Sequence, residues 1–220
     1  MTRWFSIRDA LSARAAAAAL RDVLVPPRCV GCGAPGAWFC TGCRDLCDPV
    51  ELRQGPLVVR AAGGHAGPLR DAIHRMKYRN EPGLARDLGA LVAGLLAADL
   101  ANGVRVDTVV PVSLHPSRVF DRGYDQARLL AECIADSVQL PLHVAVHRIR
   151  AGVPQRTLDR PARAANVRGA YVAEAGALRG RHVALIDDVA TTGATLGAAA
   201  EAARAAGARA VRGYTVAAEE

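Results

Sequence analysis

The sequence has little aromatic content, almost no lysine and no long apolar run. Aromatic residues make up 4% of the 220 residues, so aliphatic and alanine side chains must supply most of the core. No stretch approaches the eighteen or so apolar residues of a membrane-spanning helix. The apolar run at 15–20 is too short, and too charged at both ends, for a secretory signal. We therefore expect a cytoplasmic protein without a membrane span.

Lysine is replaced almost completely by arginine: the chain has 27 Arg and one Lys, Lys77. The formal net charge is +7, which favours anionic partners, either phosphate metabolites or nucleic acid. Hydrophobic residues make up 51% and charged residues 22%, as in an ordinary globular protein. The length suits one α/β domain with a small appendage.

The hydrophobic pattern changes along the chain. A helix is expected at 8–24, where Pro26 and Pro27 stop it, and a short strand at 57–62. An amphipathic helix is expected at 84–101. Beyond it, strands are expected at 108–112, 142–149, 182–186 and 211–216, and helices at 126–138 and 196–206. Such alternation predicts a parallel sheet with helices on both faces.

An apolar strand followed by two carboxylates and a Thr-Thr-Gly turn stands at 182–195. The turn opens a helix, whose free N–H groups suit a phosphate, and Gly193 permits close approach of the backbone. The carboxylates would accept hydrogen bonds from sugar hydroxyls, and Mg²⁺ would bind a nearby pyrophosphate. The alternative is a solvated strand end with Thr191 as a helix cap. The candidate binding residues are Asp187, Asp188, Ala190, Thr191, Thr192, Gly193, Ala194 and Thr195.

Four of the six cysteines form two C-x-x-C pairs, Cys29 with Cys32 and Cys40 with Cys43. Two such knuckles supply the four thiolates of a closed structural Zn²⁺ site. Disulfides or a redox pair are the alternatives, but neither an export signal nor a thioredoxin-like unit accompanies them. Cys47 could replace Cys43 as a ligand.

Further polar clusters accompany these motifs. A second anion site is plausible where the strand at 108–112 ends, and a basic helix start on the surface is the alternative. Lys77 follows an amphipathic helix and could simply stabilise its C-terminus. The candidate pyrophosphate-binding residues are Lys77, Ser113, Leu114, His115, Arg118 and Arg122.

The segment 148–181 carries eight Arg against two acidic residues, a net charge of +6. It predicts an exposed basic loop or hairpin. Within it, a solvated loop is the alternative to a mobile loop that closes over the phosphate site. The candidates for that loop are Gln155, Arg160, Arg163 and Asn166.

The segment 185–195 resembles the phosphoribosyl pyrophosphate (PRPP) signature of type I phosphoribosyltransferases. The resemblance implies that Asp187 and Asp188 hold the ribose 2′ and 3′ hydroxyls and that residues 191–195 hold the 5′-phosphate. It implies a pyrophosphate loop at 112–115 and a mobile loop at about 148–168.

Taken together, the motifs along nearly the whole chain are similar to the ComF competence-protein family. These motifs are Pro-Pro-Arg-Cys, the four-cysteine finger, Lys77-Tyr78, Val-Pro-Val-Ser-Leu-His, Arg-Gly-Tyr-Asp-Gln-Ala and Asp-Asp-Val-Ala-Thr-Thr-Gly-Ala-Thr. The chain departs from the family pattern at Ser113, where a second Pro is usual. The resemblance implies a role in uptake of single-stranded DNA during natural transformation, with DNA-uptake or recombination proteins as partners.

We therefore expect an N-terminal helix at 1–27, a four-cysteine zinc finger at 28–56 and a type I phosphoribosyltransferase-like α/β domain at 57–220. One hypothesis is a PRPP-binding protein that handles single-stranded DNA. The other is a Mg²⁺-dependent phosphoribosyltransferase of nucleotide salvage whose acceptor the sequence does not name.

Overall fold

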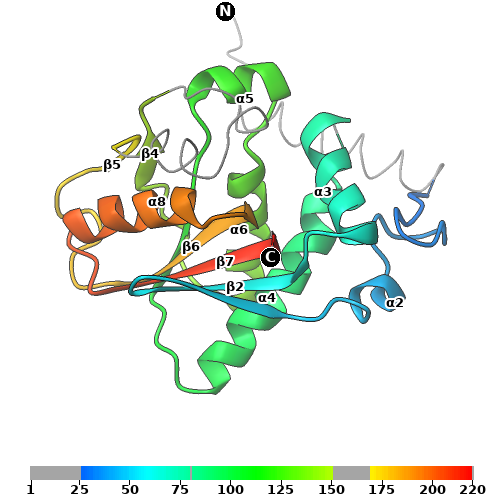
Figure 1. Ribbon diagram of the computed structural model, residues 1–220, viewed down its shortest axis with the longest axis horizontal. Coiled ribbons are helices and arrows are strands. Elements are labelled where there is room, and N and C mark those ends of the chain that lie inside the picture. The colour runs from blue at the N-terminus through cyan, green and yellow to red at the C-terminus, as the bar shows by residue number, and fades with distance from the viewer. Residues whose placement is uncertain (1–25, 80, 151–168, 220) are drawn as a thin grey trace, which may run out of the picture.

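A five-stranded sheet organises the chain, as the computed structural model in Figure 1 shows; residues 26–79, 81–150 and 169–219 are described. The strand order is β1-β2-β7-β6-β3, and only β1 runs antiparallel to its neighbour. The α/β fold with a mostly parallel sheet is thus confirmed. The strands are β1 (Val50–Gln54), β2 (Leu57–Gly64), β3 (Thr108–Pro111), β6 (His182–Ala190) and β7 (Ala210–Ala218).

Helices cover both faces of this sheet, because its central strands are apolar on both sides. In β6, Ala184 and Ile186 belong to one buried cluster, and Val183 and Leu185 belong to the other. The first cluster is completed by α3 (Gly67–Tyr78), α4 (Leu84–Ala101) and α6 (Gln126–Val138). The second is completed by α8 (Ala194–Ala205), which Figure 1 shows across the sheet from α4 and α6.

One predicted strand is largely absent from the sheet. The segment 142–149 forms only a single bridge, between Leu142 and Val109, and then the short strand β4 (Val146–Arg148). β4 pairs with β5 (Tyr171–Ala173) in a separate two-stranded antiparallel sheet. The reason is its pattern: Val146 is buried while His147 is exposed, which suits a hairpin with one covered face.

The chain before β2 is more ordered than a loop. Its second knuckle includes a short helix, α2 (Thr41–Arg44), which contains Cys43, and β1 then pairs with β2 along its whole length. The predicted helix at 8–24 lies outside the described residues. Among the described helices, none combines the length and the apolar character needed to cross a membrane.

Candidate phosphate and metal sites

The carboxylates of the phosphate motif lie inside β6. The strand was predicted to end at 186, but it continues to Ala190 because its last residues pair with β7, with Asp187 opposite Thr215 and Ala190 opposite Ala218. A turn of three residues then leads into α8, which begins at residue 194 rather than 196. The pair therefore sits on a rigid strand, at the sheet edge where ligands of α/β proteins bind.

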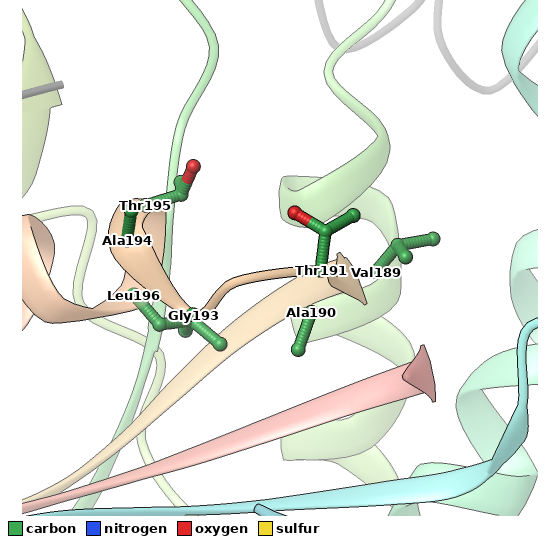
Figure 2. Close-up of a pocket in the computed structure, with 7 residues that line it drawn as sticks. All are labelled: Val189, Ala190, Thr191, Gly193, Ala194, Thr195 and Leu196. Carbon is green, nitrogen blue, oxygen red and sulfur yellow. The ribbon is translucent and has the colours of Figure 1, made fainter. Parts of the chain in front are cut away.

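The turn between β6 and α8 forms a shallow hollow. Gly193 adopts the left-handed conformation, with φ of 71°, and the amide of Ala194 donates to Oγ1 of Thr192 at 3.3 Å. Figure 2 shows the side chains of Thr191 and Thr195 on the same side of the ribbon. This arrangement combines hydroxyls with the N-terminus of a 12-residue helix, which attracts an anion. The hollow is lined by Val189, Ala190, Thr191, Gly193, Ala194, Thr195 and Leu196.

The two carboxylates of β6 differ in their surroundings. Lys77, near the end of α3, places Nζ 2.8 Å from Oδ1 of Asp188, and both side chains are mostly buried. Asp187 accepts a hydrogen bond from the amide of Asp188 at 2.8 Å. Removal from water and the charge of Asp188 raise the pKa of Asp187 to about 8. The structure thus brings the single lysine of the chain to the acidic pair.

The candidate pyrophosphate loop follows β3, the neighbour of β6. The amide of Val112 donates to the carbonyl of Ile186 at 2.8 Å, so this loop leaves the sheet beside Asp187. Asp125 holds the loop from the other side, because its carboxylate accepts from the amide of Leu114 at 3.1 Å and caps α6 through the amide of Arg128. Ser113 is buried at the start of the loop.

The remaining residues of this candidate group lie on or beside the short helix α5 (Pro116–Arg122). His115 caps α5 by accepting from the amide of Ser117 at 3.3 Å. Arg122 donates to Oε1 of Gln126 at 2.9 Å and lies over the ring of Tyr78. Arg118 lies one helical turn before Arg122 on α5 and is partly exposed. The contacts of Arg122 therefore join α5 to the end of α3.

Gln155, Arg160, Arg163 and Asn166 lie outside the described residues. The chain on either side of them is described: the amide of Ile149 donates to the carbonyl of Ala170 at 2.8 Å, next to the β4–β5 pairing. Tyr171, in β5, is buried, and burial together with the charge of Asp187 raises its pKa. Sequence reasoning gave Tyr171 no role at the site, and its proximity to Asp187 depends on the hairpin, which spacing alone does not reveal.

The four cysteines of the knuckles converge. Their sulfur atoms all lie within 4.8 Å of one another, with Cys29 and Cys43 at 3.6 Å and Cys32 and Cys40 at 3.5 Å. Tetrahedral Zn²⁺ with bonds of about 2.3 Å needs sulfurs about 3.8 Å apart, so this set fits the metal. Cys47 lies outside the cluster and contacts the carbonyl of Cys43 instead.

The thiols of the knuckles differ in their pKa values, because burial and the neighbouring thiols raise the pKa of Cys43. Burial opposes ionisation of Cys29, but backbone hydrogen bonds from Cys40 and Cys32 outweigh it and lower its pKa to about 6. A thiolate is the form that binds a metal.

The finger is docked on the junction between α3 and α4. Asp87, in the first turn of α4, accepts from the amide of Phe39 at 2.8 Å and from Arg44 at 3.2 Å. Phe39 is fully buried. A Cβ at Gly83 would lie 2.5 Å from Nε1 of Trp38, so any larger residue there would have to displace the Trp38 ring. The finger is therefore part of the molecule's packed body.

Comparisons with known proteins agree with the motifs. No family model matches the chain. Competence protein F of Haemophilus influenzae is 30% identical over 175 residues, which are 77% of this chain and 75% of that protein. DNA utilization protein YhgH of Escherichia coli K12 is 32% identical over 135 residues, 60% of this chain and 59% of that one. Glutamine PRPP amidotransferase of Bacillus subtilis aligns with a TM-score of 0.40 and 22% identity, over 60% of this chain and 26% of that one.

Proposed function

Because the chain belongs to the competence protein F family, we propose that it is a PRPP-binding protein that handles single-stranded DNA during its uptake. The observation that carries the PRPP assignment is the joining of Lys77, the acidic pair and the Thr-Thr-Gly turn at one edge of the sheet. We place this activity in the cytoplasm, where DNA-uptake and recombination proteins would be its partners.

The proposed ligand carries three groups, and the chain offers a partner for each. Residues 191–195 present hydroxyls and backbone donors to the 5′-phosphate. Asp187 and Asp188 accept from the ribose 2′ and 3′ hydroxyls. The loop at 113–115, with Lys77, faces the pyrophosphate, and Mg²⁺ bound there would neutralise its charge.

Calorimetry with PRPP and Mg²⁺ tests this assignment. Each hydrogen bond to a charged group is worth about 1.5–3 kcal/mol, so Asp187→Asn combined with Asp188→Asn should weaken PRPP binding by about 10² or more. The zinc content should not change. No heat and no thermal stabilisation of the wild type at millimolar PRPP would refute the assignment.

Turnover of PRPP would point to the second candidate, a Mg²⁺-dependent phosphoribosyltransferase. Asp187 favours it, because a carboxyl with a pKa near 8 can exchange a proton close to physiological pH. Incubation with free nucleobases and Mg²⁺, followed by assay of released pyrophosphate, separates the two. Binding without consumption supports the DNA-handling role.

The DNA-handling role predicts binding that depends strongly on salt. Arginine contacts to phosphates release counterions, so the log–log slope should be about −0.7 per contact on a single strand. Arg160→Ala with Arg163→Ala, in the segment of net charge +6, should make the slope less steep. Affinity that does not change with salt would contradict the role.

A further inference from the structure

Among the described residues, two aromatic side chains are strongly exposed, although the chain has few aromatics. Tyr78 is 50% and Phe120 is 89% exposed, whereas Phe39, Tyr171 and Tyr214 are buried. Tyr78 is the last residue of α3 and directly follows Lys77, which contacts the acidic pair. An exposed ring therefore stands at the border of the phosphate site.

Tyr78 is held in place by its neighbours. The guanidinium carbon of Arg122 lies 5.3 Å from the centroid of its ring, and the ring of His74, one turn earlier on α3, lies 4.8 Å away at 48°. The hydroxyl of Tyr124 donates to the carbonyl of Met76 and fixes the end of α3 against the start of α6. This fixed orientation lowers the entropy cost of stacking a further ring there.

The charge around Tyr78 is positive. Arg118 and Arg122 share a face of α5, since they are four residues apart, and Arg79 is exposed directly after Tyr78. Two nearby acids are paired, Glu81 with Arg75 at 2.7 Å and Asp188 with Lys77. Arg79, Arg118 and Arg122 outnumber Asp121, the acid on α5, so the surface beside Tyr78 can attract an anion.

We propose that Tyr78, with Arg118 and Arg122, forms a surface that stacks unpaired bases of single-stranded DNA at the mouth of the phosphate site. This inference rests on the proposed DNA-handling role and assigns it a location. Bases stack on aromatic rings and guanidinium planes while arginines contact the phosphates. The occupant is a polynucleotide because the surface is open and positive, whereas a free base carries no phosphates for the arginines.

The test is fluorescence anisotropy with a labelled 20-nucleotide oligo(dT). Stacking on one aromatic contributes enough that Tyr78→Ala should bind about five- to hundredfold more weakly. Tyr78→Phe keeps the ring and should restore binding. Phe120→Ala is the matched control: Phe120 is two residues from Arg122 and so lies on another face of α5. It should bind as the wild type does.

An abasic oligonucleotide of the same length separates stacking from charge. Tyr78→Ala and the wild type should bind it equally, because it has phosphates but no bases. Unchanged zinc content and an unchanged far-UV circular dichroism spectrum report that each variant is folded. Should Tyr78→Ala fail these controls, Arg118→Ala replaces it and should lower oligo(dT) affinity and salt dependence together.

Each outcome decides the matter. A wild type that binds no DNA refutes the DNA-handling role itself. A wild type that binds, with Tyr78→Ala and Arg118→Ala binding equally well, leaves the role standing and refutes this surface. Equal losses in Tyr78→Ala and Phe120→Ala, or on abasic and oligo(dT) strands, refute stacking on Tyr78. Thymidine monophosphate binding as tightly as oligo(dT) would make the site one for a free nucleotide.

Discussion

The finger and the β6–α8 turn both present polar groups on short backbone segments, but different forces hold them. The described part of the finger between 28 and 48 has three buried apolar residues, Cys29, Phe39 and Cys43. Two of them, Cys29 and Cys43, belong to the proposed zinc site. β6, in contrast, has apolar neighbours on both faces and strands on both sides. We infer that the finger depends on its metal and its docking contacts, whereas the turn takes its geometry from the sheet.

Loss of zinc is the strongest test of this comparison. Cys40→Ser removes one of four thiolates, and since the knuckles have little core of their own, the protein should lose essentially all of its zinc. Metal analysis of the purified protein should find about one zinc per chain in the wild type. Cys47→Ser is the control and should keep it, because Cys47 lies outside the cluster. Full zinc occupancy in Cys40→Ser would refute the assignment.

The pH dependence of PRPP binding tests the β6–α8 turn, the second of the two regions compared above. The raised pKa of Asp187 means that its proton must leave before the carboxylate can accept from a ribose hydroxyl. PRPP affinity should therefore rise by up to about tenfold per pH unit between pH 6.5 and 8, and then level off. Calorimetry across this range measures it.

Two variants separate this effect from titration of the ligand. Asp187→Asn should show only the pH dependence of PRPP itself. Lys77→Gln removes a charge that lowers the pKa of Asp187, so the rise in affinity should move to higher pH. A wild-type profile identical to that of Asp187→Asn would contradict the assignment.

The docking of the finger can be weakened while its metal stays bound. Asp87→Ala leaves the amide of Phe39 and the side chain of Arg44 without their acceptor and should cost about 1–3 kcal/mol of unfolding free energy. Urea denaturation of the zinc-loaded protein measures this loss. Asp71→Ala, an exposed acid on α3, is the control. No difference between the two variants would mean that the metal alone holds the finger.

The smallest expected effect is a gain in stability. A carboxyl whose folded pKa lies above its ordinary value binds more protons when folded, so unfolding free energy falls as pH rises from about 4 to 8. Asp187→Asn removes this pH dependence and should raise the Tm at pH 8.5 by at least about 2–4 °C. Scanning calorimetry at pH 5 and 8.5 tests it, and the gain should disappear at the lower pH.

The sequence predicted the parts of the molecule whose chemistry is local. Two knuckles at short spacing bring four sulfurs together, so the cluster of Cys29, Cys32, Cys40 and Cys43 follows from spacing alone. The alternation of apolar segments likewise predicted the α/β fold, because each strand must bury both faces against helices. The pairing of β6 with β7 beyond 186 was missed, since Asp187 and Asp188 lower the strand propensity that the pattern measures.

Contacts between distant segments could not be predicted in this way. Lys77 and Asp188 are far apart in the chain, and both of their local patterns allow a solvated surface. Asp99 lies within an apolar helix, yet it is buried because Tyr214 donates to it at 2.8 Å and Arg212 at 3.0 Å. The docking of Phe39 on Asp87 is similar. In each case a buried polar group depends on a partner that only the folded chain supplies.

The hydrogen bond between the amide of Ile149 and the carbonyl of Ala170 holds these two residues close together, so the chain between them can be shortened or replaced by protein engineering. Residues bonded in this way across antiparallel strands have Cα atoms only about 5 Å apart. A two-residue turn could therefore connect Arg150 to Gly169 in place of residues 151–168. Any foreign domain whose termini lie equally close could be inserted at the same place, and a circular permutant could begin and end there, with the sheet and both of its helical layers left intact.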